Sequence, residues 1–125
     1  MPLSQLLWQH ARREAPLECV GVLGGVQGAD WEARVYVPLT NVDPLPSARY
    51  QADPAELLGT LRRWRGQSLE LVGIFHSHPR GPAEPSERDR QWAAYPVPYL
   101  IADLRTEQLG AWWLPQGGTA EVTQV

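Results

Sequence analysis

The chain opens with apolar residues at helical spacing. Leu3, Leu6, Leu7 and Ala11 recur on one face of residues 4–14, which predicts an amphipathic helix. The apolar run that follows is of strand length, so the pattern changes from helix to strand near the start of the chain.

Two strands are expected next, over residues 18–26 and residues 31–39. The glycines after Leu23 begin a turn between them, and Val35 and Val37 share one side of the second strand. Apolar and polar residues alternate sufficiently over residues 31–39 for this strand to pair with the first.

A proline-rich loop and a second helix occupy the middle of the chain. Residues 41–47 read as the loop and residues 48–52 as a short strand. Asp53 is a helix N-cap followed by Pro54 at the first helical position, and we expect this helix to end near Arg65.

The second half of the chain adds further strands and a third helix. Residues 69–76 predict a central strand, residues 86–94 a helix, and residues 99–103, 109–114 and 120–123 the closing strands. A chain of 125 residues has the size of one domain. The sequence therefore predicts an α/β fold, a single domain over residues 1–125 with one mixed, curved β-sheet and about three helices.

Composition narrows the classes of function. The net charge of −3 gives no reason to expect nucleic acid as a partner. One cysteine excludes an internal disulfide and a cysteine-ligated zinc site, and the absence of lysine excludes a lysine nucleophile. No apolar run approaches transmembrane length and no signal-peptide pattern is present, so we expect no membrane partner and a cytoplasmic protein.

The densest group of metal-binding residue types lies between residues 76 and 89. His76 and His78 end the apolar strand, where alternate residues project to one face. Pro79 stops the strand, a loop follows, and Ser86 and Asp89 open the next helix as N-cap and third helical residue. These elements can bring Asp89 beside the histidines, and three such ligands leave the fourth position of a catalytic zinc ion to water.

Each of these residues has a simpler interpretation when taken alone. Ser86 and Asp89 match a helix capping box, and a single histidine at a strand end is more often a surface residue. The combined pattern His-x-His-Pro-x(6)-Ser-x(2)-Asp is more specific, since average residue usage produces it roughly once in a hundred thousand chains of this length. The signatures of zinc deaminases and of His-Glu-x-x-His proteases are absent from the sequence.

The combined pattern resembles the signature of the JAMM (MPN-plus) metalloprotease family. That signature also has a glutamate upstream, before an apolar strand, and Glu18 matches it. Residues 49–54 resemble another family feature, an arginine-aromatic strand followed by a helix that begins at Asp-Pro. The resemblance implies the JAMM/MPN fold, which is related to that of cytidine deaminases.

The resemblance also implies roles for five residues. His76, His78 and Asp89 would bind one zinc ion, with water as the fourth ligand. Glu18 would be the general base that takes a proton from the attacking water, and Ser86 would hydrogen-bond the oxyanion of the tetrahedral intermediate.

A class of substrate follows from the same resemblance. The family includes peptidases and isopeptidases that cut after the diglycine tail of ubiquitin or ubiquitin-like proteins. A chain this short resembles the compact bacterial members, which are expected to process ubiquitin-like sulfur-carrier proteins. Two alternatives stay open: a catalytically silent MPN-like scaffold that binds partners, and a zinc hydrolase of other small peptides. A strand edge could also pair two copies of the chain as a homodimer.

Overall fold

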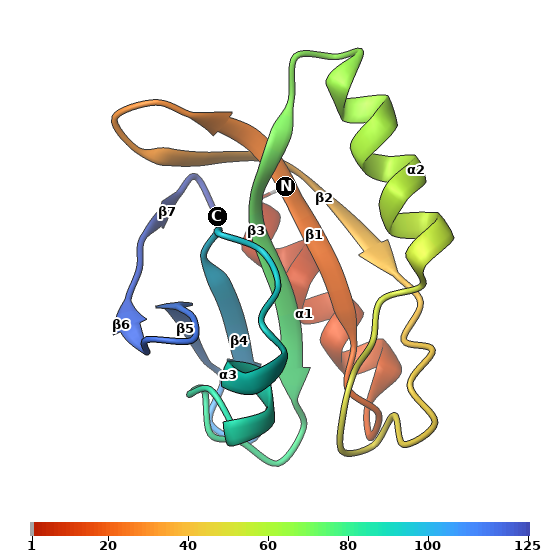
Figure 1. Cartoon of the computed structure of the whole chain (residues 1–125). Coiled ribbons are helices and arrows are strands. Elements are labelled where there is room, and N and C mark those ends of the chain that lie inside the picture. The colour runs from red at the N-terminus through yellow and green to blue at the C-terminus, as the bar shows by residue number, and fades with distance from the viewer. Residues whose placement is uncertain (1) are drawn as a thin grey trace.

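One mixed sheet of seven strands forms the centre of the fold, in the order β6-β5-β4-β3-β1-β2-β7 (Figure 1). The structure is a computed structural model and describes residues 2–125. The elements in chain order are α1 (Leu3–Glu14), β1 (Val20–Gln27), β2 (Trp31–Leu39), α2 (Pro54–Arg65), β3 (Glu70–His78), α3 (Glu87–Trp92), β4 (Tyr99–Asp103), β5 (Gln108–Trp113), β6 (Gly118–Thr119) and β7 (Val122–Thr123). The predicted α/β class, with a mixed sheet and three helices, is confirmed.

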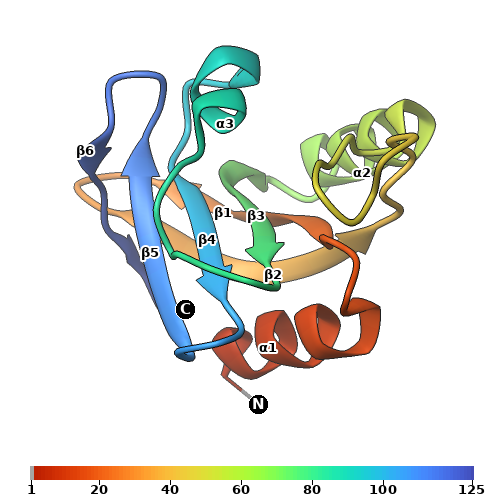
Figure 2. The ribbon, with the colours of Figure 1, turned by 90° about the horizontal axis from the view of Figure 1, so that it is seen from below.

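Helices lie on both faces of the sheet (Figure 2). On one face α1 packs through Leu7 and Ala11 against a buried cluster that includes Phe75 of β3. On the other face Trp64 of α2 packs in a second cluster with Ile74. Because successive strand residues point to opposite faces, β3 contributes to both clusters, which explains its continuous apolar sequence.

The sheet is strongly curled. Only Ala120 and Glu121 separate β6 from β7, although these strands lie at opposite ends of the sheet order. Such a connection spans roughly 10 Å, so the two edges of the sheet must approach one another. The rings of Trp31 on β2 and Trp113 on β5 confirm this approach, with centroids 5.4 Å apart.

The curl corrects one sequence prediction. A single strand was expected over residues 120–123, but the chain makes two short strands that pair with different neighbours, β6 with β5 and β7 with β2. Within residues 2–125, β7 pairs only with Trp31 and Glu32, so most of the β2 edge has no partner strand. Homodimer formation through a strand edge stays a prediction.

Four other features differ from the prediction. The expected strand over residues 48–52 is wrong, since this segment makes only an isolated bridge between Asn41 and Ala52, and its other backbone hydrogen bonds are turn contacts and bonds to the Asn41 side chain. β3 continues to His78 because β4 pairs with it up to that residue. β1 begins at Val20, which leaves Glu18 before the strand. The third helix is shorter than expected and ends at Trp92, where Ala93 adopts an extended backbone.

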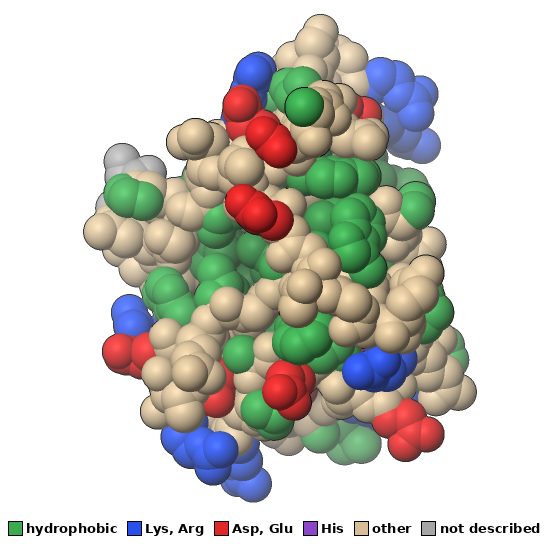
Figure 3. All heavy atoms as spheres, turned by 90° about the vertical axis from the view of Figure 1, so that its left-hand side faces the viewer, with side chains coloured by type: hydrophobic (Ala, Val, Ile, Leu, Met, Phe, Trp, Pro, Cys, Tyr) green, Lys and Arg blue, Asp and Glu red, His purple; other side chains and the backbone are tan. Residues whose placement is uncertain are grey.

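The surface shows no large region of one charge in the view that faces the viewer in Figure 3. Acidic and basic groups are scattered there around patches of hydrophobic side chains. Among residues 2–125, no helix combines the length and the apolar character that crossing a bilayer requires.

Candidate metal centre

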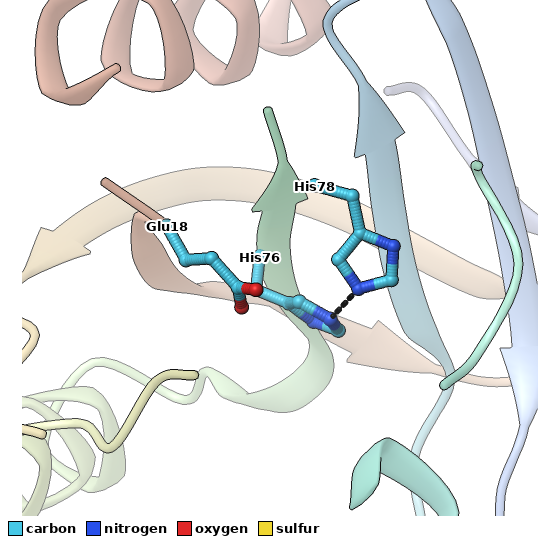
Figure 4. A group of neighbouring side chains, drawn as sticks. All are labelled: Glu18, His76 and His78. Carbon is cyan, nitrogen blue, oxygen red and sulfur yellow. Dashed lines mark hydrogen bonds between the residues drawn. The ribbon is translucent and has the colours of Figure 1, made fainter. Parts of the chain in front are cut away.

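Two histidines meet at the end of β3. His76 and His78 are alternate residues of this strand, so both project toward the same side, and their Nε2 atoms lie 3.1 Å apart (Figure 4). His76 is fully buried between its partners Val20 on β1 and Ile101 on β4. The strand alternation that the sequence predicted is what brings the two imidazoles together.

Asp89 joins them from the first turn of α3. Its Oδ2 atom lies 3.2 Å from Nε2 of His76 and 3.1 Å from Nε2 of His78. The same oxygen accepts a hydrogen bond from the backbone N–H of Ser86, and the Ser86 hydroxyl accepts one from the Asp89 N–H. The capping box that the sequence offered as a simpler interpretation is therefore present, and it also holds the carboxylate beside the histidines.

The three atoms fit a tetrahedral cation. Ligands at about 2.0–2.1 Å from a zinc ion lie roughly 3.3 Å from one another, close to the separations found here. Nδ1 of His78 lies 2.7 Å from the carbonyl oxygen of Pro82, which fixes the ring, and in the neutral ring protonated at Nδ1 the lone pair of Nε2 is available to a metal. Two imidazoles and a carboxylate therefore fit a metal site, and this donor set suits zinc.

A glycine in the loop after β3 allows the Pro82 carbonyl to reach His78. Gly81 has a φ of 68°, a left-handed conformation, and a Cβ at this position would overlap the carboxylate of Asp103. Asp103 in turn accepts hydrogen bonds from the backbone of the next turn, at Arg105 and Thr106. The chain can therefore turn tightly enough for Pro82 to reach His78.

Glu18 lies beside the histidines, in the short segment before β1. Its carboxylate and the two imidazoles provide ligand atoms that all lie within 4.8 Å of one another (Figure 4). The side chain is 8% exposed. Hydrogen bonds between Cys19 and Ser77, from N–H to Oγ at 2.9 Å and from the Ser77 N–H to the Cys19 carbonyl at 3.2 Å, tie this segment to β3. The structure thus brings together residues that are far apart in the sequence.

The protonation of the cluster follows from burial and from its own contacts. Burial raises the pKa of Glu18 to about 7, against an opposing effect of His78. Burial also lowers the pKa of His76, which favours the neutral ring that a metal needs. Burial opposes ionisation of Asp89, but hydrogen bonds from both histidines outweigh it and hold the pKa of that carboxyl well below its usual range. For His78, the contacts with Asp89 and the Pro82 carbonyl outweigh burial and raise the pKa.

Two hollows meet at this cluster. A cleft of about 240 Å³ on one side is lined by Glu18, His78, Ser86 and the loop of residues 79–85. Ser86 is exposed there, and its hydroxyl hydrogen is not used by the hydrogen bond that it accepts. A second hollow, a groove of about 380 Å³, reaches the cluster at Asp89. Its aromatic lining residues are Tyr50, Trp92, Tyr95 and Tyr99.

The five residues selected from the sequence therefore lie near one another, with Asp89 and Glu18 beside the histidines and Ser86 in the cleft that Glu18 and His78 line. Sequence reasoning missed the residues that hold them, chiefly Asn41 and Tyr50. Asn41 donates a hydrogen bond to the Glu18 carbonyl, and the ring of Tyr50 stacks on His76. Neither position belongs to a recognisable metal-binding pattern, although Tyr50 lies in the arginine-aromatic segment that supported the family resemblance.

Comparisons with known proteins agree with this geometry. A family model described as prokaryotic homologs of the JAB domain matches residues 2–115. The "Probable TtuB-protein conjugate cleaving protease" of Thermus thermophilus is 44% identical over 108 residues, 86% of this chain and 69% of that protein. A "Desampylase" of Haloferax volcanii is 37% identical over 100 residues, 74% of this chain and 69% of that protein. A "CysO-cysteine peptidase" of Mycobacterium tuberculosis is 36% identical over 97 residues, 77% of this chain and 65% of that protein.

Solved structures give the same result for the fold. A protein from Desulfitobacterium hafniense superimposes with a TM-score of 0.82 at 32% identity, over 97% of this chain and 86% of that one. A JAB1/MPN domain protein from Archaeoglobus fulgidus has a TM-score of 0.61 at 18% identity, over 96% of this chain and 90% of that one, and it shows the fold alone. By sequence and by structure, the chain belongs to the prokaryotic JAB-domain family, as its resemblance to the JAMM signature predicted.

Proposed function

We propose that this protein is a zinc-dependent JAMM-type peptidase or isopeptidase that cuts after the diglycine tail of a ubiquitin-like protein of the sulfur-carrier type. The observation that carries the proposal is the cluster of His76, His78 and Asp89, whose ligand atoms lie 3.1–3.2 Å apart, with the Glu18 carboxylate beside them. The names of two relatives, a probable TtuB-protein conjugate cleaving protease and a CysO-cysteine peptidase, support this class of substrate.

His76, His78 and Asp89 would hold the metal. When bound, zinc supplies Lewis-acid chemistry, which polarises the scissile carbonyl and lowers the pKa of a water molecule to about 7. The hydrogen bond between His78 and Pro82 and the backbone N–H of Ser86 on Asp89 orient two of the three ligands.

Glu18 would act as general base and then as general acid. It takes a proton from the attacking water and later gives it to the nitrogen of the leaving group. In the metal-free protein burial raises the pKa of the Glu18 carboxyl to about 7, and a bound cation would favour the ionised form that accepts the proton. Ser86 would donate its free hydroxyl hydrogen to the oxyanion that forms on the substrate carbonyl.

The position of Glu18 sets the direction of the substrate. The group that protonates the leaving amine must lie next to it, so the leaving group belongs in the cleft lined by Glu18 and Ser86. The diglycine tail would then occupy the other hollow, the aromatic groove that reaches Asp89. Glycines suit this approach because they allow close contact with the residues around the metal.

The test is the intact mass of a Gly-Gly-tailed carrier protein with a short C-terminal extension after incubation with the zinc-loaded enzyme. We expect cleavage after the second glycine by the wild type, and none by Glu18→Gln or in the presence of chelator. Glu121→Gln is the matched control, because Glu121 is exposed between β6 and β7, and it should cleave like the wild type. Cleavage that survives Glu18→Gln would remove Glu18 from the base role.

Specificity needs a separate comparison. An unrelated unfolded peptide should be cut far more slowly than the tailed carrier, and equal rates would overturn the diglycine proposal. Binding of the carrier without turnover, in protein shown to contain zinc, would instead favour a silent scaffold. The presence of all three ligand residues in one cluster argues against that alternative.

A further inference from the structure

The segment of residues 41–52, here called the bridging loop, contacts the metal site at two places without supplying a predicted ligand or catalytic group. It connects β2 to α2 and makes no strand within residues 2–125, and its one isolated bridge joins its own ends, Asn41 and Ala52. Its residues line both the cleft, through Ser47, and the groove, through Tyr50. The bridging loop therefore borders both hollows.

The first contact is with the backbone of Glu18. The Glu18 N–H donates to the Pro46 carbonyl at 2.8 Å, and the Asn41 side-chain amide donates to the Glu18 carbonyl at 2.9 Å. Glu18 precedes β1 and has no strand ladder to fix it. The bridging loop thus satisfies both the N–H and the carbonyl of Glu18, as a neighbouring strand would in a sheet.

The side chain of Asn41 makes four hydrogen bonds, of which the one to Glu18 is the first. Its Nδ2 also donates to the Arg49 carbonyl at 3.0 Å, and its Oδ1 accepts from the N–H groups of Asp43 and Gln51, each at 3.0 Å. Only an amide offers two donors and an acceptor oxygen in this arrangement. The side chain can therefore act as a rigid link between the loop and Glu18.

The second contact is with a metal ligand. The ring of Tyr50 stacks on His76, with centroids 4.3 Å apart and an angle of 26° between the planes. His76 is fully buried, yet its Nδ1 has no hydrogen-bond partner within residues 2–125. A metal-binding histidine is usually oriented through this second nitrogen, as His78 is by Pro82. For His76 the stacked ring is what fixes the plane.

We propose that the bridging loop positions both halves of the site, with Asn41 fixing the backbone of Glu18 and Tyr50 fixing the ring plane of His76. Asn41 and Tyr50 are positioning residues. The Asn41 part rests on the proposed role of Glu18, whereas the Tyr50 part requires only that His76 binds the metal. The two parts predict different defects.

For Tyr50, the measurement is zinc affinity by competition with a chromophoric chelator. Tyr50→Leu should weaken zinc binding by about 10- to 100-fold, as loss of an orienting partner does, and Tyr50→Phe, which keeps the stacked ring, should stay within about 3-fold of the wild type. Wild-type affinity in Tyr50→Leu would overturn this part. A loss as large in Tyr50→Phe would also overturn it, because the hydroxyl and not the ring would then be responsible.

For Asn41, the measurements are kcat and KM on the tailed carrier at saturating zinc. Asn41→Ala should lower kcat at least about 10-fold, since a small displacement of a catalytic group has effects of this size, while KM and zinc affinity change less than about 3-fold. Val42→Ala is the control within the same loop, because that side chain is 44% exposed and lines neither hollow. Asn41→Asp, which keeps the acceptor oxygen, is the second variant if Asn41→Ala does not fold, and the same kcat loss is expected.

An activity-independent measurement separates this inference from the proposed function. Amide hydrogen exchange at Glu18 should accelerate in Asn41→Ala, while exchange in β1 stays as in the wild type. If the wild type cleaves no carrier but exchange at Glu18 accelerates, the substrate proposal fails and the positioning stands. Unchanged exchange and unchanged kcat would overturn the role of Asn41. A parallel loss of stability, zinc affinity and kcat in all variants would mean that the loop only supports the fold.

Discussion

Replacing Glu18 by glutamine should stabilise the metal-free protein above neutral pH while abolishing turnover. The carboxylate is 8% exposed, and burial raises its pKa from 4.5 to about 7. A shift of this size corresponds to roughly 3 kcal/mol between the two protonation states. Because the side chain also faces an open cleft, where solvent screens charge, we expect about 2 kcal/mol.

The direction in which pH changes the unfolding free energy follows from the raised pKa of Glu18. The folded protein holds the Glu18 proton more tightly than the unfolded chain, so the contribution of Glu18 to stability is fully present below pH 4.5 and is lost as the pH rises through about 7. Glu18→Gln cannot ionise and escapes this loss. The free energy of unfolding of the variant, relative to the wild type, should therefore rise between pH 4.5 and about pH 7 and then level off.

The assay is urea unfolding at several pH values with chelator present, with Glu121→Gln as the matched control. The control should follow the wild type at every pH, because its side chain is exposed. Zinc should shrink the difference between Glu18→Gln and the wild type, since a cation beside the carboxylate favours its ionised form. A difference that does not change with pH, or that favours the wild type as the pH rises, would refute the reasoning.

Three further predictions concern the metal, the oxyanion donor and the core. Zinc binding near pH 6 should release a proton from His78, whose pKa is raised, and the apparent zinc affinity should fall with decreasing pH. Calorimetry in two buffers of different ionisation enthalpy measures the released proton, and binding heats that are the same in both buffers would contradict the prediction. Ser86→Ala should slow cleavage by roughly 100-fold and destabilise the protein by about 1 kcal/mol through loss of the helix cap, and rates and unfolding measured on the same preparation separate the two effects. Gly21→Ala should destabilise the fold by about 1–3 kcal/mol, because its new Cβ would overlap the Tyr36 ring, whereas Gly28→Ala meets no atom within 4 Å and should be nearly neutral by thermal unfolding.

The local geometry of the metal ligands could be predicted from the sequence. His76 and His78 belong to one strand, and the alternation of strand residues is enough to place them on one face. Ser86 and Asp89 belong to one helical turn, and the capping box fixes their relative positions. These relations span few residues and depend on backbone geometry that the sequence pattern specifies.

Glu18 is a different case. Its selection depended on the resemblance to a family signature, because an isolated glutamate before an apolar strand carries no signal of its own. The structure brings it to the histidines by pairing β1 with β3, where Val20 lies opposite His76. That pairing joins segments far apart in the chain, and the sequence pattern alone does not specify the register.

What the sequence determined by itself was the order of helices and strands, the ligand cluster within one strand and one helical turn, and the family. Tertiary structure alone decided the curl of the sheet, the division of residues 118–123 between two edges, and the loop conformation that lets Asn41 and Tyr50 hold the site. The physical reason is the range of the interactions. Periodicity and capping act over a few residues, whereas sheet closure and side-chain links between loops depend on contacts that exist only once the chain has folded.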